Sequence, residues 1–92
     1  MLEITKPEVL QRAIDTWGEE AQYYMTVEEC AELIQAICKH MNRGADTENL
    51  VEEAADVFIM LSQVVAMTDE AAIQRVVDQK LAKLEKRLNS GG

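Results

Sequence analysis

The hydrophobic and polar positions along the chain repeat with the 3.6-residue period of an α-helix in four segments. These segments span about 7–17, 19–42, 48–67 and 70–88. Thr5 and Pro7 favour the start of the first helix, and Gly18 favours its end. No segment shows the alternating apolar and polar residues that are typical of a half-buried strand. The pattern therefore predicts a single all-α, four-helix bundle-like domain over residues 1–92, with residues 89–92 as a frayed tail.

The start of the second helix has two interpretations. Residues 26–29 have the form of a capping box, which would use Glu29 as a helix cap. A start near Glu19 is favoured, because several residues then fall at spacings of three and four on one continuous stripe. This stripe consists of Gln22, Met25, Glu29, Glu32 and Ala36. The two interpretations compete, because a capping role would remove Glu29 from any metal site.

The third helix is apolar on nearly all sides. It follows a break with Gly44 as a helix stop and Asp46 or Thr47 as the next cap. Such a helix is normally buried on most sides, and a chain of 92 residues hardly supplies enough packing partners by itself. We therefore expect the third helix to line a subunit interface in a homodimer or homotetramer.

The formal net charge of -8 disfavours binding to nucleic acid or to anionic membranes, because both need clustered Lys and Arg. The longest apolar run, Val57 to Leu61, is far shorter than the roughly 20 residues of a membrane span, and the sequence starts without a signal-like segment. A cytoplasmic protein is expected. Cys30 and Cys38 lie about 12 Å apart on one helix, too far for a disulfide, and His40 alone makes a zinc site improbable.

Two pairs of carboxylates are spaced three residues apart on successive helices, so that Glu29 shares a face with Glu32, and Glu53 with Asp56. If these helices pack antiparallel, the four groups meet, and each pair about 5 Å apart repels by roughly 3 kcal/mol. A divalent cation such as Mg²⁺ is the simplest remedy. A metal is favoured because an unpaired charge in so apolar a helix costs several kcal/mol. The competing interpretation is ion pairing with Lys39, Arg43, Lys80 and Lys83.

The sequence Glu28-Glu29-x-x-Glu32, followed after a loop by Glu53-x-x-Asp56, resembles the E-E-x-x-E and E-x-x-D signature of the all-α nucleoside triphosphate pyrophosphohydrolases, the MazG-like superfamily. The upstream Trp17-Gly18-x-x-x-Gln22 is similar to that of compact phage or bacterial members. The resemblance implies that Glu28 and Glu29 are the catalytic candidates, with Glu28 beside the metal ligands or activating water. It also implies that Mg²⁺, or Mn²⁺ in its place, is held by Glu29, Glu32, Glu53 and Asp56.

The last helix of that family carries the basic element K-x-x-x-N-x-x-R, which the resemblance links to substrate binding. Lys80 and Arg87 match its ends, Lys83 lies between them, and Leu84 replaces the Asn.

Four further residues are candidate substrate contacts, each with a structural alternative. Gln22 can bond a base or phosphate, or be a surface residue at a helix start. Trp17 can stack on a base, or belong to the core. Lys39 and Arg43 can reach phosphate, or they can interact favourably with the helix dipole at the C-terminal end of the second helix.

The resemblance implies Mg²⁺-dependent hydrolysis of a nucleoside triphosphate to the monophosphate and pyrophosphate. One alternative is phosphoribosyl-ATP pyrophosphohydrolase, which the run Glu52 to Asp56 also resembles, although no lysine-rich approach precedes Glu28. The other is a non-catalytic helical interaction module, with the four carboxylates as a surface for partners. A di-iron bundle is disfavoured, because it needs Glu-x-x-His pairs that the chain lacks.

Overall fold

The computed structural model describes residues 1–43 and 47–91 of the chain, and this part contains four α-helices and no strand. The helices are α1 (Pro7–Trp17), α2 (Glu19–Arg43), α3 (Thr47–Met67) and α4 (Glu70–Asn89). The all-α class predicted from the periodicity is therefore confirmed for the described residues. The expected stop at Gly44 and the expected cap at Asp46 lie outside them.

The first helix begins at a proline, whose backbone is restricted, and ends before a glycine, whose backbone is permissive. Pro7 opens α1, but the N-cap is Lys6 and makes no side-chain hydrogen bond, so the expected cap at Thr5 is wrong. At the other end the Gly18 N–H donates to the Ile14 carbonyl at 2.8 Å. Gly18 has a φ of 87°, where a residue without a side chain is favoured. This one residue therefore turns the chain from α1 into α2.

The second helix is continuous from Glu19, which confirms the earlier of the two predicted starts. Thr26 lies inside the helix, and its hydroxyl donates to the Gln22 carbonyl at 2.7 Å instead of capping a new helix. The capping-box interpretation is therefore wrong. As a result, Glu29 is a mid-helix residue whose side chain projects from α2 toward a neighbouring element.

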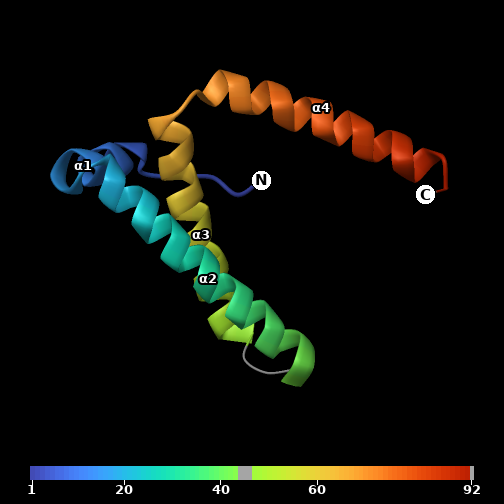
Figure 1. Cartoon of the computed structure of the whole chain (residues 1–92), viewed down its shortest axis with the longest axis horizontal. Helices are drawn as coiled ribbons and strands as arrows, with labels where there is room; N and C mark the ends of the chain where they lie inside the picture. The colour runs from blue at the N-terminus through green and yellow to red at the C-terminus, as the bar shows by residue number, and fades with distance from the viewer. Residues whose placement is uncertain (44–46, 92) are drawn as a thin grey trace.

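Figure 1 shows α2 and α3 as an antiparallel pair, with α1 against the end where α2 begins. Their shared interior is small. Its buried apolar side chains are Ile14, Ala36 and Met60, and its buried polar ones are Gln22 and Gln63. Gln63 Nε2 donates to Gln22 Oε1 at 3.0 Å, so that one buried hydrogen bond joins α2 to α3. This bond fixes the register of the two helices.

The fourth helix extends away from the other three (Figure 1) and, among the described helices, contacts only α3. Thr68 and Asp69 form the connection: the Thr68 hydroxyl donates to the Val64 carbonyl at 2.7 Å, and Asp69 Oδ1 accepts from the Ala72 N–H at 3.0 Å. No residue of α4 is buried. The radius of gyration is 16.0 Å, against about 12 Å for a compact domain of this length. None of the described helices is long and apolar enough to cross a lipid bilayer.

Candidate functional site

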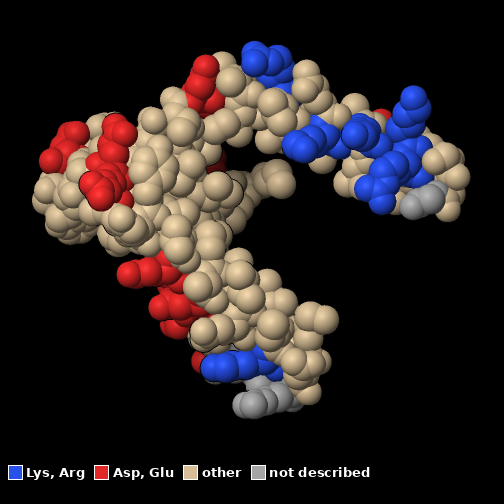
Figure 2. All heavy atoms as spheres, in the orientation of Figure 1, with Lys and Arg blue, Asp and Glu red and all other residues tan. Residues whose placement is uncertain are grey.

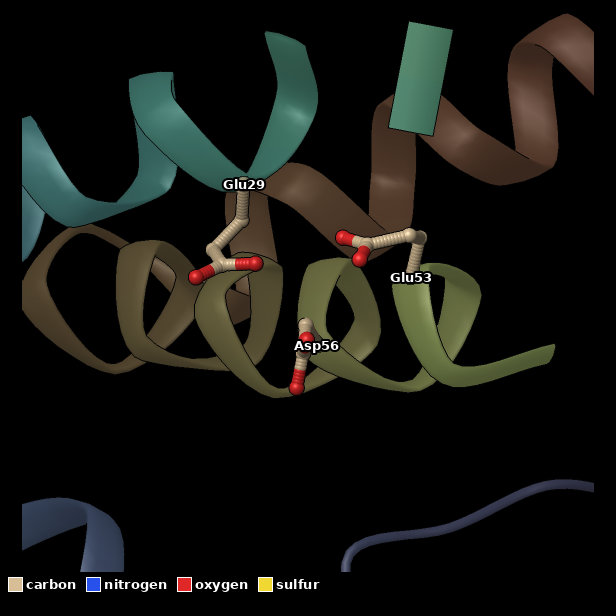
Figure 3. A group of neighbouring side chains, drawn as sticks. All are labelled: Glu29, Glu53 and Asp56. Carbon is tan, nitrogen blue, oxygen red and sulfur yellow. The ribbon is translucent and has the colours of Figure 1, made fainter. Parts of the chain in front are cut away.

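Three carboxylates from two helices converge in the α2–α3 pair. Glu29 comes from α2 and Glu53 and Asp56 come from α3, and one oxygen of each lies within 4.8 Å of the others. Figure 3 shows the Glu29 side chain descending from α2 toward α3, with the Glu53 carboxylate turned toward it. We call these three residues the acidic cluster. Their spacing suits oxygens that share one cation.

The hydrogen bond between Gln22 and Gln63 sets the register of α2 against α3, and this register determines where the acidic cluster lies. Glu29 follows Gln22 by seven residues, and Asp56 precedes Gln63 by seven, which is about two helical turns in each helix. Residues two turns apart lie on the same face. Because the helices run antiparallel, the hydrogen bond between the glutamines brings Glu29 opposite Asp56. The amide pair and the acidic cluster therefore lie on one seam.

The acidic cluster lacks a neutralising partner among the described side chains. The Oε2 atoms of Glu29 and Glu53 are buried and have no hydrogen-bond partner. In the described part of the chain, Lys39, Lys80 and Lys83 form no ion pair with these carboxylates, while the Arg43 side chain lies outside that part. A buried carboxylate oxygen without a partner is unfavourable. The geometry therefore favours a bound cation over the alternative of structural ion pairs.

Desolvation and mutual repulsion perturb two members of the cluster. Burial raises the pKa of Glu29 above 4.5, and the negative charges of Glu32, Asp56 and Glu53 raise it further. Burial is also the largest cause that raises the pKa of Glu53, followed by the effect of the neighbouring Glu32 carboxyl. Glu32 is exposed and lies outside the group of three, but it is close enough to act on both carboxyls.

The donor set determines which ions the site can hold. It consists of carboxylate oxygens alone, which are the ligands that Mg²⁺, Mn²⁺ and Ca²⁺ prefer. Cys30 and Cys38 are free and exposed, and neither belongs to the cluster. A hard divalent cation therefore fits these residues better than a thiophilic one.

Neither Gln22 nor Trp17 lies where its purely structural role, at the surface or in the core, would put it. Gln22 is only 1% exposed and bonded to Gln63, so the surface interpretation is wrong. Its Nε2 also lies 3.8 Å from the Met25 sulfur. Trp17 is 62% exposed at the end of α1, so the core interpretation is wrong within one chain. A substrate contact by Trp17 stays a prediction, whereas the Gln22 amide is buried and occupied by Gln63.

The basic candidates lie away from the acidic cluster in a single chain. Lys39 is exposed and follows Glu29 by ten residues, about 15 Å along α2. The described basic residues of α4 are exposed on a helix that, of the other described helices, contacts α3 alone. They include the three predicted substrate contacts Lys80, Lys83 and Arg87. Glu28 is exposed beside Glu29.

Two features of this region were not predicted from the sequence. One is the hydrogen bond from Gln63 to Gln22, and its signal in the sequence is an amide in the apolar second half of α3, two turns from Asp56. The other is an apolar groove of about 590 Å³ between the segment before α1, α1 itself and α3. A hydrophobic pattern shows which faces are apolar, but it does not show where they leave a hollow.

A comparison with known protein families finds a match for the part of the chain that carries the acidic cluster. The family model described as the MazG nucleotide pyrophosphohydrolase domain matches residues 18–91, which include α2, α3, α4 and the whole acidic cluster. No curated protein and no solved structure matches the chain.

Proposed function

The chain belongs to the MazG nucleotide pyrophosphohydrolase family, and on that premise we propose that it hydrolyses nucleoside triphosphates, with bound Mg²⁺, to the monophosphate and pyrophosphate. The observation that carries the proposal is the convergence of Glu29, Glu53 and Asp56, with two buried oxygens that lack partners. Mn²⁺ would replace Mg²⁺, because both accept oxygen ligands.

Glu29, Glu53 and Asp56 would hold the cation, with Glu32 as a fourth ligand at the exposed side. The ion would neutralise the triphosphate and polarise its α-phosphoryl group. Glu28 is exposed beside this set and would accept a proton from the attacking water, as would Glu29. The water oxygen bonds to the α-phosphorus, the bond from that phosphorus to the α–β bridging oxygen breaks, and pyrophosphate leaves.

Phosphate contacts would come from Lys80, Lys83 and Arg87, whose charges suit the leaving pyrophosphate. Among the described helices of one chain α4 contacts only α3, so these side chains would act at the site of another subunit. This supports a homodimer or homotetramer as the active form. Lys39 and Arg43 would contact the substrate from the end of α2, and Trp17 from its start. Gln22, which is 1% exposed and bonded to Gln63, would support the site by holding α2 against α3.

The test is incubation with a panel of canonical and modified nucleoside triphosphates, and with phosphoribosyl-ATP, in the presence of Mg²⁺ and ¹⁸O-labelled water. We expect the label in the monophosphate, because attack at the α-phosphorus places the water oxygen there. Label in orthophosphate would mean attack at the γ-phosphorus. Turnover of phosphoribosyl-ATP alone would assign the chain to that reaction instead.

Glu53→Gln keeps the shape of the side chain and removes its charge, and should lower kcat/KM by at least about 100-fold. Glu52→Gln is the matched control, because Glu52 is exposed on the same helix and outside the acidic cluster. Equal activity of the two variants, or no pyrophosphate from any nucleotide, would contradict the proposal and favour a non-catalytic helical module.

A further inference from the structure

The hydrogen bond between Gln22 and Gln63 leaves the two buried amides only partly satisfied. In the described part of the chain, Gln63 Oε1 is buried without a hydrogen-bond partner. Gln22 Nε2 donates to the Met25 sulfur at 3.8 Å, and a thioether is a weak acceptor. Buried polar groups without good partners lower the free energy of unfolding, and an apolar pair of the same shape avoids this loss. Stability alone therefore does not account for two glutamines in this place.

The amide pair holds the helices in one register, which apolar side chains would not do. Hydrophobic contact is non-directional, so an apolar seam permits α3 to slide along α2. A hydrogen bond between two buried amides forms in one register, and buried polar residues fix register in coiled coils. A slip by one turn would move α3 by about 5.4 Å. The oxygens of the acidic cluster lie within 4.8 Å of one another, so such a slip would take the cluster apart.

The acidic cluster itself destabilises this register when no cation is bound, because its three carboxylates repel one another. Residues 1–69 contain fourteen acidic and four basic residues. On the face shown in Figure 2, acidic side chains lie mostly over the first three helices and basic ones are gathered on α4. Basic side chains therefore offset little of the repulsion. The hydrogen bond between the amides acts against it, two helical turns away.

We propose that Gln22 and Gln63 are positioning residues, which keep the acidic cluster assembled while no cation is bound. This role rests on the proposed function, since it takes the cluster as the cation site. The amides touch neither the cation nor the substrate and act through the two helices that carry them. A site that is assembled beforehand binds its ligand more tightly, because less of the binding free energy is needed to bring the carboxylates together.

The decisive variant is Gln22→Met/Gln63→Met, which removes the hydrogen bond and leaves no buried amide. Methionine is about as long as glutamine, apolar and adaptable, so the pair should pack in the same space. Gln63→Met alone leaves Gln22 Oε1 buried without a donor. The double variant should therefore unfold at a higher denaturant concentration than this single variant. Its fold is retained, while its register is no longer specified.

The first test measures the register in chelator-treated protein by the distance between two spin labels. In a background with Cys30→Ser and Cys38→Ser, the labels are attached at Glu20→Cys on α2 and Ala66→Cys on α3, which are exposed positions. Dilution with unlabelled protein restricts the signal to pairs within one chain. The wild-type amides should give one narrow distance distribution.

In the double methionine variant this distribution should broaden or shift by about 5 Å, which is one helical turn. An unchanged narrow distribution in a folded double variant would overturn the proposal, because α2 and α3 would then keep their register without the amides.

The second test measures the affinity for Mn²⁺ and Mg²⁺ by calorimetric titration. The double methionine variant should raise the dissociation constant at least about 10-fold, as the loss of groups that orient metal ligands does. Ala36→Gly is the matched control. Ala36 is buried and follows Glu29 by seven residues, so it lies two turns from the cluster on the side away from the amides.

The control substitution should lower the midpoint of denaturation, because glycine is unfavourable inside a helix. It leaves the amide pair intact and should keep the dissociation constant within about twofold of the wild type. Equal loss of affinity in the control would mean that affinity follows stability, and would overturn the positioning role. A wild type that binds neither ion would overturn the proposed function and the affinity expected here. The spin-label distances are measured without metal, so they test the amide pair separately from that function.

Discussion

Gln63 Nε2 donates a buried hydrogen bond of 3.0 Å to Gln22 Oε1, two helical turns along the seam from the place where Glu29 meets Asp56. Both amides are at most 2% exposed, and Gln63 Oε1 has no partner of its own. A slip of α3 against α2 by one turn would leave both amides unbonded. The bond therefore favours the one register in which the carboxylates converge.

Removing both glutamines should destabilise the fold by less than the two single changes added together. Gln63→Leu leaves Gln22 Oε1 buried without a donor, which costs about 1–3 kcal/mol of unfolding free energy. The double variant Gln22→Leu/Gln63→Leu should cost less than the sum of the two single changes. Denaturant unfolding at one protein concentration measures this cycle. Additive single effects would mean that the bond does not couple the helices.

Divalent cations should stabilise the fold through the acidic cluster. A ligand that binds only the folded state adds about 2.7 kcal/mol when its concentration is 100 times its dissociation constant. Thermal unfolding with increasing Mg²⁺ or Mn²⁺ should therefore show a rising midpoint for the wild type and for Glu52→Gln. Glu53→Gln should show no such rise. A similar rise in Glu53→Gln would place the cation elsewhere.

The metal-free protein should lose stability as pH rises. The pKa values of Glu29 and Glu53 are raised above 4.5, so that between 4.5 and the raised values the folded state binds more protons than the unfolded state. The free energy of unfolding then falls with increasing pH across that window. Chelator-treated protein, unfolded by denaturant at a series of pH values, should show this fall, and saturating Mg²⁺ should remove it.

In the same chelator-treated series, the free energy of unfolding of Glu53→Gln should exceed that of the wild type. The amide removes one repelling charge, so the variant should be more stable than the metal-free wild type at neutral pH. A less stable variant would mean that the Glu53 carboxylate contributes a favourable contact in the absence of metal.

Trp17 provides a direct report on substrate binding, because it is the one tryptophan of the chain and is 62% exposed. If it stacks on a base, a nonhydrolysable nucleotide should quench its fluorescence, and Trp17→Ala should raise KM with little change in kcat. The same substitution should change the unfolding free energy by less than about 0.5 kcal/mol, as exposed residues usually do. Unchanged fluorescence at saturating nucleotide would remove Trp17 from the binding site.

The sequence predicts the helices well, because residues such as Ile14, Ala36 and Met60 repeat with the helical period and are buried. It also indicates the convergence of α2 and α3, since the charges of Glu53 and Asp56 stand out in an apolar helix. Pairing between distant polar residues is harder to predict. Gln22 belonged to the same stripe as Glu29, but nothing local to it indicated that Gln63 would bury it.

The position of α4 was also beyond prediction from periodicity. The spacing of Leu81, Leu84 and Leu88 identifies an apolar side, but it does not say whether that side meets the same chain or another. The connection at Thr68 and Asp69 decides this, because it directs α4 away from α1 and α2.

That connection has a consequence for how tightly copies can associate. The Thr68 side chain is hydrogen-bonded to α3 and the Asp69 side chain to α4, so that only the few backbone angles between them are left to set the direction of α4. Preorganisation of this kind lowers the conformational entropy lost on binding. Glycines inserted between Thr68 and Asp69 would loosen the helix while leaving its side chains intact, and would weaken self-association without altering a single contact residue.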